Sequence, residues 1–181
     1  MQVYYSNPYS VEKNIGKAIN DFCKLVPNDK DWIVIQDGDM TYLTPDWGKR
    51  VYDALKLDGD KFGLVGCRTN RLRGVHQIYG EKFSDNHDIR YHYEIAKNCN
   101  ESGIQDIGKL GVAGFFMAFR KEVWKRTGGF EENSIVFDTR FNIKVRSLRM
   151  KIGLIRGLYV YHQYRIWNDK DPFSDTKHLR L

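Results

Sequence analysis

Hydrophobic residues alternate between two spacings along the chain. Over residues 12–26, apolar side chains recur every three or four positions, which predicts an amphipathic helix; they are Ile15, Ala18, Ile19, Phe22 and Val26. Elsewhere apolar residues form short continuous runs: VYYS (3–6), WIVIQ (32–36) and FGLVGC (62–67). Runs of this length are typical of strands that are buried on both faces of a sheet.

The same alternation continues through the second half of the chain. Thr44 is expected to cap a helix that begins at Pro45, and VAGFFMAFR (112–120) reads as a strand before a short helix at 122–126. A further helix carries Phe141, Val145, Leu148 and Ile152, and GLYVYHQY (157–164) reads as the last strand. Strands alternating with helices predict one α/β domain over residues 1–181, with a mostly parallel sheet flanked by helices.

Residues 68–92 differ from this pattern. The segment is polar and weakly periodic, with one short strand expected near HQIYG (76–80). A connection of this length is usually a functional lid or a disordered segment. We therefore expect it to cover a ligand.

Asp37 and Asp39 follow directly after the apolar run 32–36. In parallel sheets ligands bind beyond the carboxyl ends of the strands, which is where these two carboxylates would lie. Two converging carboxylates offer oxygen ligands for Mg²⁺ or Mn²⁺, whereas a solvated Asp-Gly-Asp turn is the alternative. The string DGDMT (37–41) also fits the motif of haloacid-dehalogenase phosphatases, in which Asp37 would be the nucleophile. No apolar strand ends in the second acidic pair that such enzymes need.

Composition narrows the class of protein. The chain has 41% hydrophobic and 29% charged residues, and its apolar runs are shorter than the ~18 residues of a membrane span. The first residues lack a signal-peptide pattern and the three cysteines form no CxxC pair, so we expect a cytoplasmic protein without a zinc site or disulfides. The net charge is +6, with ten Lys or Arg and three Asp after residue 138. No nucleic-acid-binding motif accompanies this basic third, so nucleic acid is not an expected partner.

Several segments in order resemble the GT-A glycosyltransferases, in particular the large inverting family that uses nucleotide-sugar donors. NIGKAIN (14–20) resembles the helix before the metal-binding strand, and WIVIQDGD (32–39) resembles that strand with its DxD motif. TPDW (44–47) matches the start of the next helix, and residues 111–132 resemble the acceptor segment with its Gly-Gly-Phe-acidic ending. FDTRF (137–141) stands in the place of a Glu-Asp pair, and YVYH (159–162) ends where many such enzymes carry a metal-ligating histidine.

The resemblance implies a single GT-A-like (Rossmann-like) domain that moves a hexosyl group from a UDP- or GDP-sugar to a saccharide or another hydroxyl acceptor. Mn²⁺ or Mg²⁺ would be held by Asp37, Asp39 and His162, and Asp138 would be the general base with Glu132 as second catalytic candidate. The implied donor-binding residues are Ser6, Asn14, Lys17, Asp37 and Gly114. The implied acceptor-binding residues are Trp124, Gly129, Phe130 and Glu131. Arginines of the 68–92 segment would contact the diphosphate, and an acceptor linked to a lipid or at a membrane surface stays open.

Two departures from the family keep alternatives open. Only thirteen residues precede Asn14, where full-length members carry further strand–helix units, so we expect a compact or shortened member. Phe137 also replaces the first acidic residue of the Glu-Asp pair. A non-catalytic module that binds a sugar or nucleotide-sugar is therefore an alternative for the whole protein. Single residues also have structural alternatives: Asp138 as a helix cap, and Trp124 and His162 as core side chains.

Overall fold

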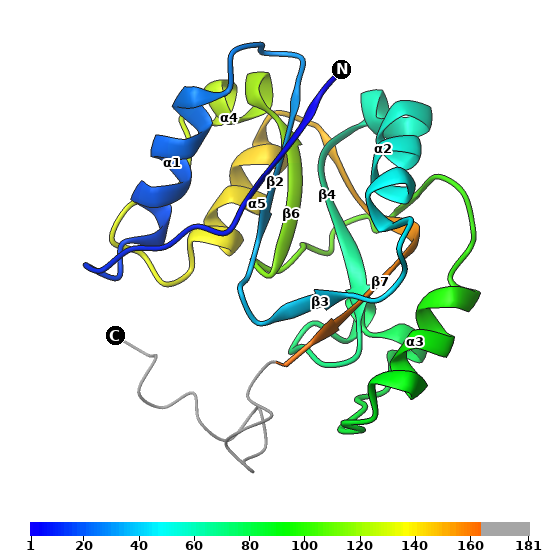
Figure 1. Ribbon diagram of the computed structural model, residues 1–181. Helices are drawn as coiled ribbons and strands as arrows, with labels where there is room; N and C mark the ends of the chain where they lie inside the picture. Colours follow the sequence, from blue (N-terminus) through cyan, green and yellow to red (C-terminus); the bar gives the residue numbers. More distant parts are fainter. Residues whose placement is uncertain (164–181) are drawn as a thin grey trace.

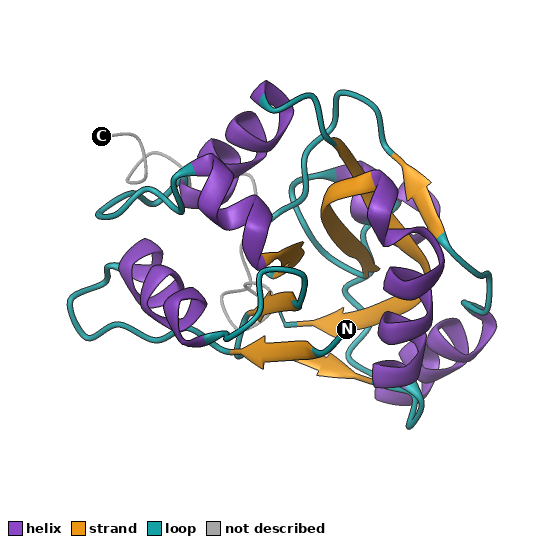
Figure 2. Cartoon of the chain, turned by 90° about the horizontal axis from the view of Figure 1, so that it is seen from above, coloured by secondary structure: helices purple, strands orange, loops and turns teal. Residues whose placement is uncertain are grey.

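The computed structural model describes residues 1–163, which form an α/β domain with one open sheet between two groups of helices (Figure 1). The strands are β1 (Val3–Ser6), β2 (Trp32–Gln36), β3 (Met40–Tyr42), β4 (Phe62–Thr69), β5 (Ile104–Asp106), β6 (Phe116–Arg120) and β7 (Lys151–His162). The helices are α1 (Ile15–Leu25), α2 (Trp47–Asp58), α3 (Ile89–Asn98), α4 (Lys121–Thr127) and α5 (Phe137–Ser147), with 3₁₀ turns η1 (Gly59–Lys61), η2 (Val75–Gln77) and η3 (Tyr79–Glu81). The view from above in Figure 2 shows the strands between the helices.

The sheet is mixed, so the expectation of a mostly parallel sheet is not confirmed. Its order is β1-β2-β6-β4-β7-β3, and β5 pairs with β7. Within the described range, β1 with β2 and β4 with β7 are parallel, and the other four pairs are antiparallel. The hydrophobic pattern does not reveal these directions, because β3 and β6 pair with strands that are distant in the sequence.

The core lies on both faces of the sheet. Successive residues of a strand point to opposite faces, and here both faces are apolar. Ile33 and Ile35 of β2 pack with α1 and α5, whereas Trp32 and Val34 pack with α2. This two-sided burial is what the continuous apolar run 32–36 predicts. None of the helices among residues 1–163 is both long and apolar enough to span a membrane.

The helix expected to begin at Pro45 with Thr44 as its cap begins instead at Trp47, and Asp46 is its N-cap residue. Two further helix boundaries differ from the prediction because of left-handed residues. Lys13 has φ 60°, and α1 begins only after Asn14, whose Oδ1 accepts the Lys17 backbone N–H at 3.1 Å. The helix expected to reach Ile152 ends at Ser147, since Arg149 has φ 59° and turns the chain into β7. Position 152 is therefore a strand residue. Left-handed residues commonly end helices, although arginine gives no such signal in a sequence.

The segment 68–92 is more ordered than its polarity predicts. The strand expected at 76–80 is instead the pair of 3₁₀ turns η2 and η3, and Asn70, Arg71, Leu72, Gln77 and Ile78 are buried. Its last residues open α3, a helix that the hydrophobic pattern does not predict. The buried face of α3 carries His92 and Ala96, whereas the apolar Ile89, Tyr91 and Tyr93 are exposed. The short strands β3 and β5 also leave no periodic signal.

Candidate metal and ligand site

The turn after β2 brings the paired aspartates to the end of β7. Asp37 continues the ladder with its N–H donated to the Phe115 carbonyl at 2.9 Å, and a turn at residues 38 and 39 then leads into β3. β3 pairs antiparallel with β7, with Met40 opposite His162. Because Asp39 directly precedes Met40, this register places its carboxylate beside the His162 ring.

Asp37, Asp39 and His162 offer ligand atoms that all lie within 4.8 Å of one another. His162 Nε2 is 3.1 Å from Asp39 Oδ1 and 4.0 Å from Asp37 Oδ2. Two ligand atoms bound side by side to one Mg²⁺ ion at ~2.1 Å would lie about 3 Å apart. The 3.1 Å separation matches this spacing and the 4.0 Å separation is longer, and two carboxylates and an imidazole are ligand types that divalent cations take.

His162 is the fixed member of this group. Its side chain is 2% exposed, whereas those of Asp37 and Asp39 are 48% and 47% exposed. The His162 ring stacks on Phe115 with 5.0 Å between centroids, and its backbone N–H donates to Asn70 Oδ1 at 2.8 Å. A buried ring that faces two half-exposed carboxylates leaves the open side of the group toward solvent.

The pKa values of the two carboxyl groups shift in opposite directions. Partial burial raises the pKa of Asp37; the charges of Asp39 and Asp138 also raise it, while His162 lowers it. The hydrogen bond from His162 lowers the pKa of Asp39. Negative charge at Asp37 is thus incompletely compensated within the protein, and a cation would compensate it.

Asp37 and His162 line a cavity of about 480 Å³ together with Asp138. Asp138 lies in the first turn of α5, and its Oδ2 accepts the Gly114 N–H at 3.0 Å while Oδ1 accepts the Thr139 N–H at 2.6 Å. The helix cap position belongs to Val136, so the alternative role of Asp138 as N-cap is wrong. A carboxylate has about four acceptor positions, which leaves capacity for a ligand. Gly114, a predicted donor residue, lines the same cavity.

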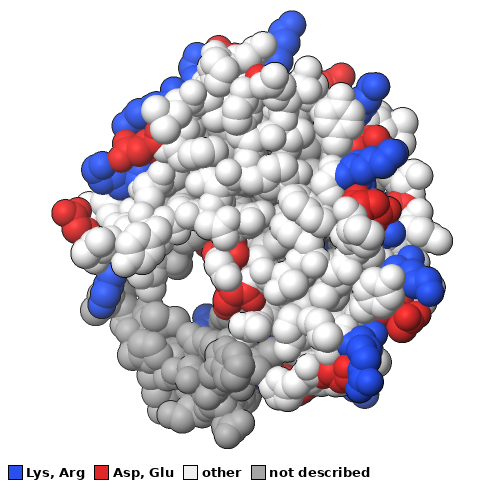
Figure 3. Space-filling model, viewed as in Figure 1, with Lys and Arg blue, Asp and Glu red and all other residues white. Residues whose placement is uncertain are grey.

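Figure 3 shows the charge distribution around this region. Acidic side chains lie near the middle of the face, whereas Lys and Arg lie mostly around the outline. Arg73 is exposed, and it lines the cavity. Arg68 instead donates to Gln105, and Arg71 is buried and pairs with Asp85. Of these three arginines, only Arg73 is placed to meet an anion in the cavity.

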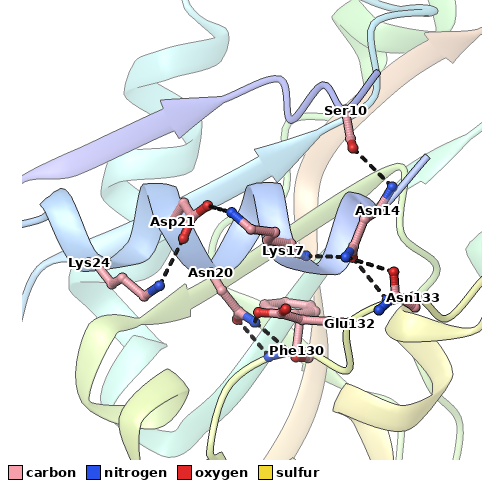
Figure 4. A network of polar contacts seen from close by, with 9 residues as sticks. All are labelled: Ser10, Asn14, Lys17, Asn20, Asp21, Lys24, Phe130, Glu132 and Asn133. Carbon is pink, nitrogen blue, oxygen red and sulfur yellow. Dashed lines mark hydrogen bonds and ion pairs between the residues drawn. The ribbon is translucent and has the colours of Figure 1, made fainter. Parts of the chain in front are cut away.

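The predicted donor residues of α1 have structural contacts. Asn14 Oδ1 accepts the backbone N–H groups of Lys17 and Asn133, and Asn14 Nδ2 donates to Asn133 Oδ1 at 2.9 Å (Figure 4). Lys17 is exposed and pairs with Asp21. Neither Asn14 nor Lys17 is among the described residues that line the cavity. Ser6 ends β1 opposite Ile35 and does not line it either.

None of the predicted acceptor residues is among the described residues that line the cavity. Phe130 is 3% exposed and stacks on Phe141 at 4.1 Å, so it is a core side chain with little surface for an acceptor. Trp124 Nε1 donates to Asn20 Oδ1 at 2.9 Å, and Glu131 pairs with Arg140.

Gly129 and Glu132 belong to the same region. Gly129 has φ 77°, and Glu132 Oε1 accepts from Asn20 Nδ2 at 3.2 Å. Neither residue lines the 480 Å³ cavity within the described chain. These contacts give the acceptor-like segment a structural role.

Asn70 is a site residue that the sequence analysis missed. It is 2% exposed, and besides His162 it accepts from Thr69 Oγ1 and exchanges bonds with residue Ser84. The signal was present, because Asn70 follows the buried strand β4 as Asp37 follows β2. Polar residues that directly follow a buried strand are candidates for a site, and this reasoning would have found Asn70 if it had been applied to β4 as well as to β2.

Comparisons with known proteins identify no relatives. No protein-family model matches the chain, and no curated protein matches it. The site is therefore interpreted from its own geometry.

Proposed function

We propose that this protein is a metal-dependent glycosyltransferase of the GT-A type, which moves a sugar from a nucleotide-sugar to a hydroxyl acceptor. One observation carries the proposal: Asp37, His162 and Asp138 line one cavity of about 480 Å³, and Asp39 joins the first two as a third ligand. A cavity of this size suits a small-molecule ligand. The ordered motifs of the sequence support the same class.

The residues divide the chemistry among them. Asp37, Asp39 and His162 would hold Mn²⁺ or Mg²⁺, which when bound neutralises the diphosphate leaving group. Arg73, which lines the same cavity, would donate to phosphate oxygens. Asp138 would accept the proton of the acceptor hydroxyl as that oxygen bonds to the sugar carbon and the bond to the diphosphate breaks.

The two alternatives have less support. A phosphatase with Asp37 as nucleophile would need a lysine nearby, and no lysine is among the described residues that line the cavity. A binding module without catalysis would keep the cavity but would not need the Asp138 carboxylate. Only turnover measurements separate this second alternative from the enzyme.

The test is calorimetry of UDP and GDP with Mn²⁺ or with a chelator. We expect one of them to bind at least about tenfold more tightly with Mn²⁺, which is about 1.4 kcal/mol. Asp39→Ala removes one of three ligands and should abolish this difference. Asp53→Ala is the matched control, because Asp53 is a similarly exposed aspartate on α2, with its side chain 54% exposed.

Two results would contradict the proposal. The first is equal affinity of both nucleotides with and without metal. The second is a metal effect that Asp39→Ala leaves intact, because the cation would then bind elsewhere.

A further inference from the structure

The lining of the 480 Å³ cavity is of two chemical kinds. Asp37, Arg73, Asp138 and His162 supply charged or ionisable groups. Six apolar residues line the same cavity: Pro8, Ile15, Leu72, Ile135, Val136 and Phe137. We call these six residues the apolar wall. A diphosphate and a metal ion need the charged groups, so the apolar wall requires another explanation.

The apolar wall exposes side chains that a protein normally buries. Ile135 is 60% exposed and Val136 is 43% exposed, and they are consecutive. Adjacent exposed aliphatic residues at the edge of a cavity are typical of ligand-binding surfaces. Single exposed apolar residues elsewhere on the chain do not carry this meaning.

The apolar wall is also held in place. One part comes from the connection between β1 and α1, and another from the segment before α5. Asn14 and Asn133 join the two parts through bonds of 2.9 Å from Asn14 Nδ2 to Asn133 Oδ1 and from Asn133 N–H to Asn14 Oδ1. Gly16 allows this approach, since a Cβ there would lie 2.1 Å from the Glu131 carbonyl oxygen. The wall is thus a built surface beside Asp138.

We propose that the acceptor is a small alcohol or glycoside that carries an aryl or alkyl group, and that this group packs on the apolar wall. The inference rests on the proposed function, because it assigns the acceptor of the same site. Asp138 lies in the first turn of α5, directly after Val136 and Phe137 of the wall. An acceptor seated there would present its hydroxyl to the Asp138 carboxylate. We expect a small molecule, because the apolar wall and Asp138 line the same cavity.

The test compares phenyl β-D-glucopyranoside with methyl β-D-glucopyranoside by NMR titration of the ¹⁵N-labelled protein. We expect the phenyl glycoside alone to shift the amide signals of Leu72, Ile135 and Val136. Ile135→Gln should weaken its binding at least about threefold, because apolar contact area is lost. Leu25→Gln is the matched control: Leu25 is 78% exposed at the other end of α1 from Ile15, and this change should have no effect.

The titration is run with Mn²⁺ and with a chelator, so that two failures can be told apart. The apolar wall contains no proposed metal ligand, so the phenyl glycoside should bind in both conditions. If the phenyl glycoside binds at the wall while no nucleotide shows metal dependence, the wall assignment stands and the glycosyltransferase proposal fails.

Three outcomes would overturn the assignment. The phenyl and methyl glycosides could produce equal shifts, or neither could bind. Alternatively, Ile135→Gln could leave phenyl glycoside binding unchanged and weaken only the binding of phosphatidylcholine vesicles in a parallel sedimentation arm. That last result would assign the apolar wall to a membrane surface.

Discussion

At the scale of the residue, Asp37 and Asp39 have neighbouring positions and different surroundings. His162 donates to Asp39 at 3.1 Å and lowers its pKa, whereas burial raises the pKa of Asp37. Asp39 is thus held by His162, and the charge of Asp37 is less compensated; a cation bound by all three side chains would replace the contact between His162 and Asp39. Such an asymmetric pair is typical of functional sites.

Asp138 is the side chain whose replacement tests catalysis. Asp138→Asn keeps one oxygen, which can accept the Gly114 N–H, and loses the acceptor of the Thr139 N–H, so we expect the protein to fold with a small loss of stability and to keep its donor affinity. Loss of the carboxylate should reduce turnover by about 10²-fold or more, the usual contribution of a positioned general base. The measurement is sugar transfer under single-turnover conditions, with donor affinity measured separately.

Glu132→Gln is the companion variant for this experiment. Glu132 contacts Asn20 and does not line the cavity within the described chain, so its amide should support near-normal transfer. Normal transfer by the Asp138 variant together with a large loss in the Glu132 variant would assign the base to Glu132 instead.

Gly16 tests how closely α1 must approach the segment before α5. A Cβ on Gly16 would meet the Glu131 carbonyl oxygen at 2.1 Å, so Gly16→Ala should lower the free energy of unfolding by about 1–3 kcal/mol. Gly48→Ala in α2 is the control, since a Cβ there meets nothing within 4 Å and alanine favours helix by about 0.5 kcal/mol. Urea unfolding should show shifts of opposite sign. A neutral Gly16→Ala change would mean that α1 can move away without cost.

At the scale of the element, the Asp58 carboxylate connects helix α2 to strand β5 through a hydrogen bond. Asp58 ends α2, and its Oδ2 accepts the Ile104 N–H at 3.1 Å where β5 begins. The Lys61 ammonium and this N–H lower the pKa of Asp58. Because Lys61 is largely exposed, most of the stabilisation is expected from the bond to β5.

Asp58→Ala should therefore destabilise the protein in a pH-dependent way. A carboxyl whose folded pKa is lowered stabilises the fold above its ordinary pKa of 3.8, and this contribution is lost as the pH falls through the lowered value. We expect a loss of about 1 kcal/mol near neutral pH, which shrinks in acid. Asp53→Ala, an exposed aspartate of α2, is the control. A loss that is the same at neutral and acidic pH would show that the charge of Asp58 is irrelevant.

At the scale of the whole molecule, the reactivity of three buried thiols can show whether the protein unfolds cooperatively. Cys23, Cys67 and Cys99 are free and buried, and burial raises the pKa of Cys23 to about 12 and that of Cys99 to about 11. Thiolates react and buried neutral thiols do not.

If residues 1–181 form one cooperative domain, an aromatic disulfide reagent should label no cysteine in the native protein and all three cysteines in urea. The urea midpoint for labelling should coincide with that of circular dichroism, as expected for a two-state transition. Rapid native labelling of Cys99 alone would mean that α3 opens independently of the sheet.

The central strands of the sheet and helix α2 could be predicted, because their burial leaves a characteristic spacing of apolar residues in the sequence. The runs 32–36 and 62–67 are strands, and the spacing of Val51, Ala54 and Leu55 marks a helix. The short β3 and β5 and the helix α3 could not be predicted, because their stability comes from pairing with β7 and from buried polar residues such as His92. The hydrophobic spacing also could not predict whether paired strands run parallel or antiparallel, because this depends on which strands become neighbours in the sheet.

By itself the sequence determined which segments are buried and that paired carboxylates follow a buried strand, because burial and strand ends are local properties of a chain. Only the tertiary structure decided which partners those carboxylates meet. The antiparallel register of β3 on β7 brings Asp39 to His162, 123 positions away in the sequence. Asn14 and Asn20, in a motif expected to bind the donor, form hydrogen bonds with residues 130–133. Contacts of such sequence separation arise from the packing of the whole sheet, and no local pattern encodes them.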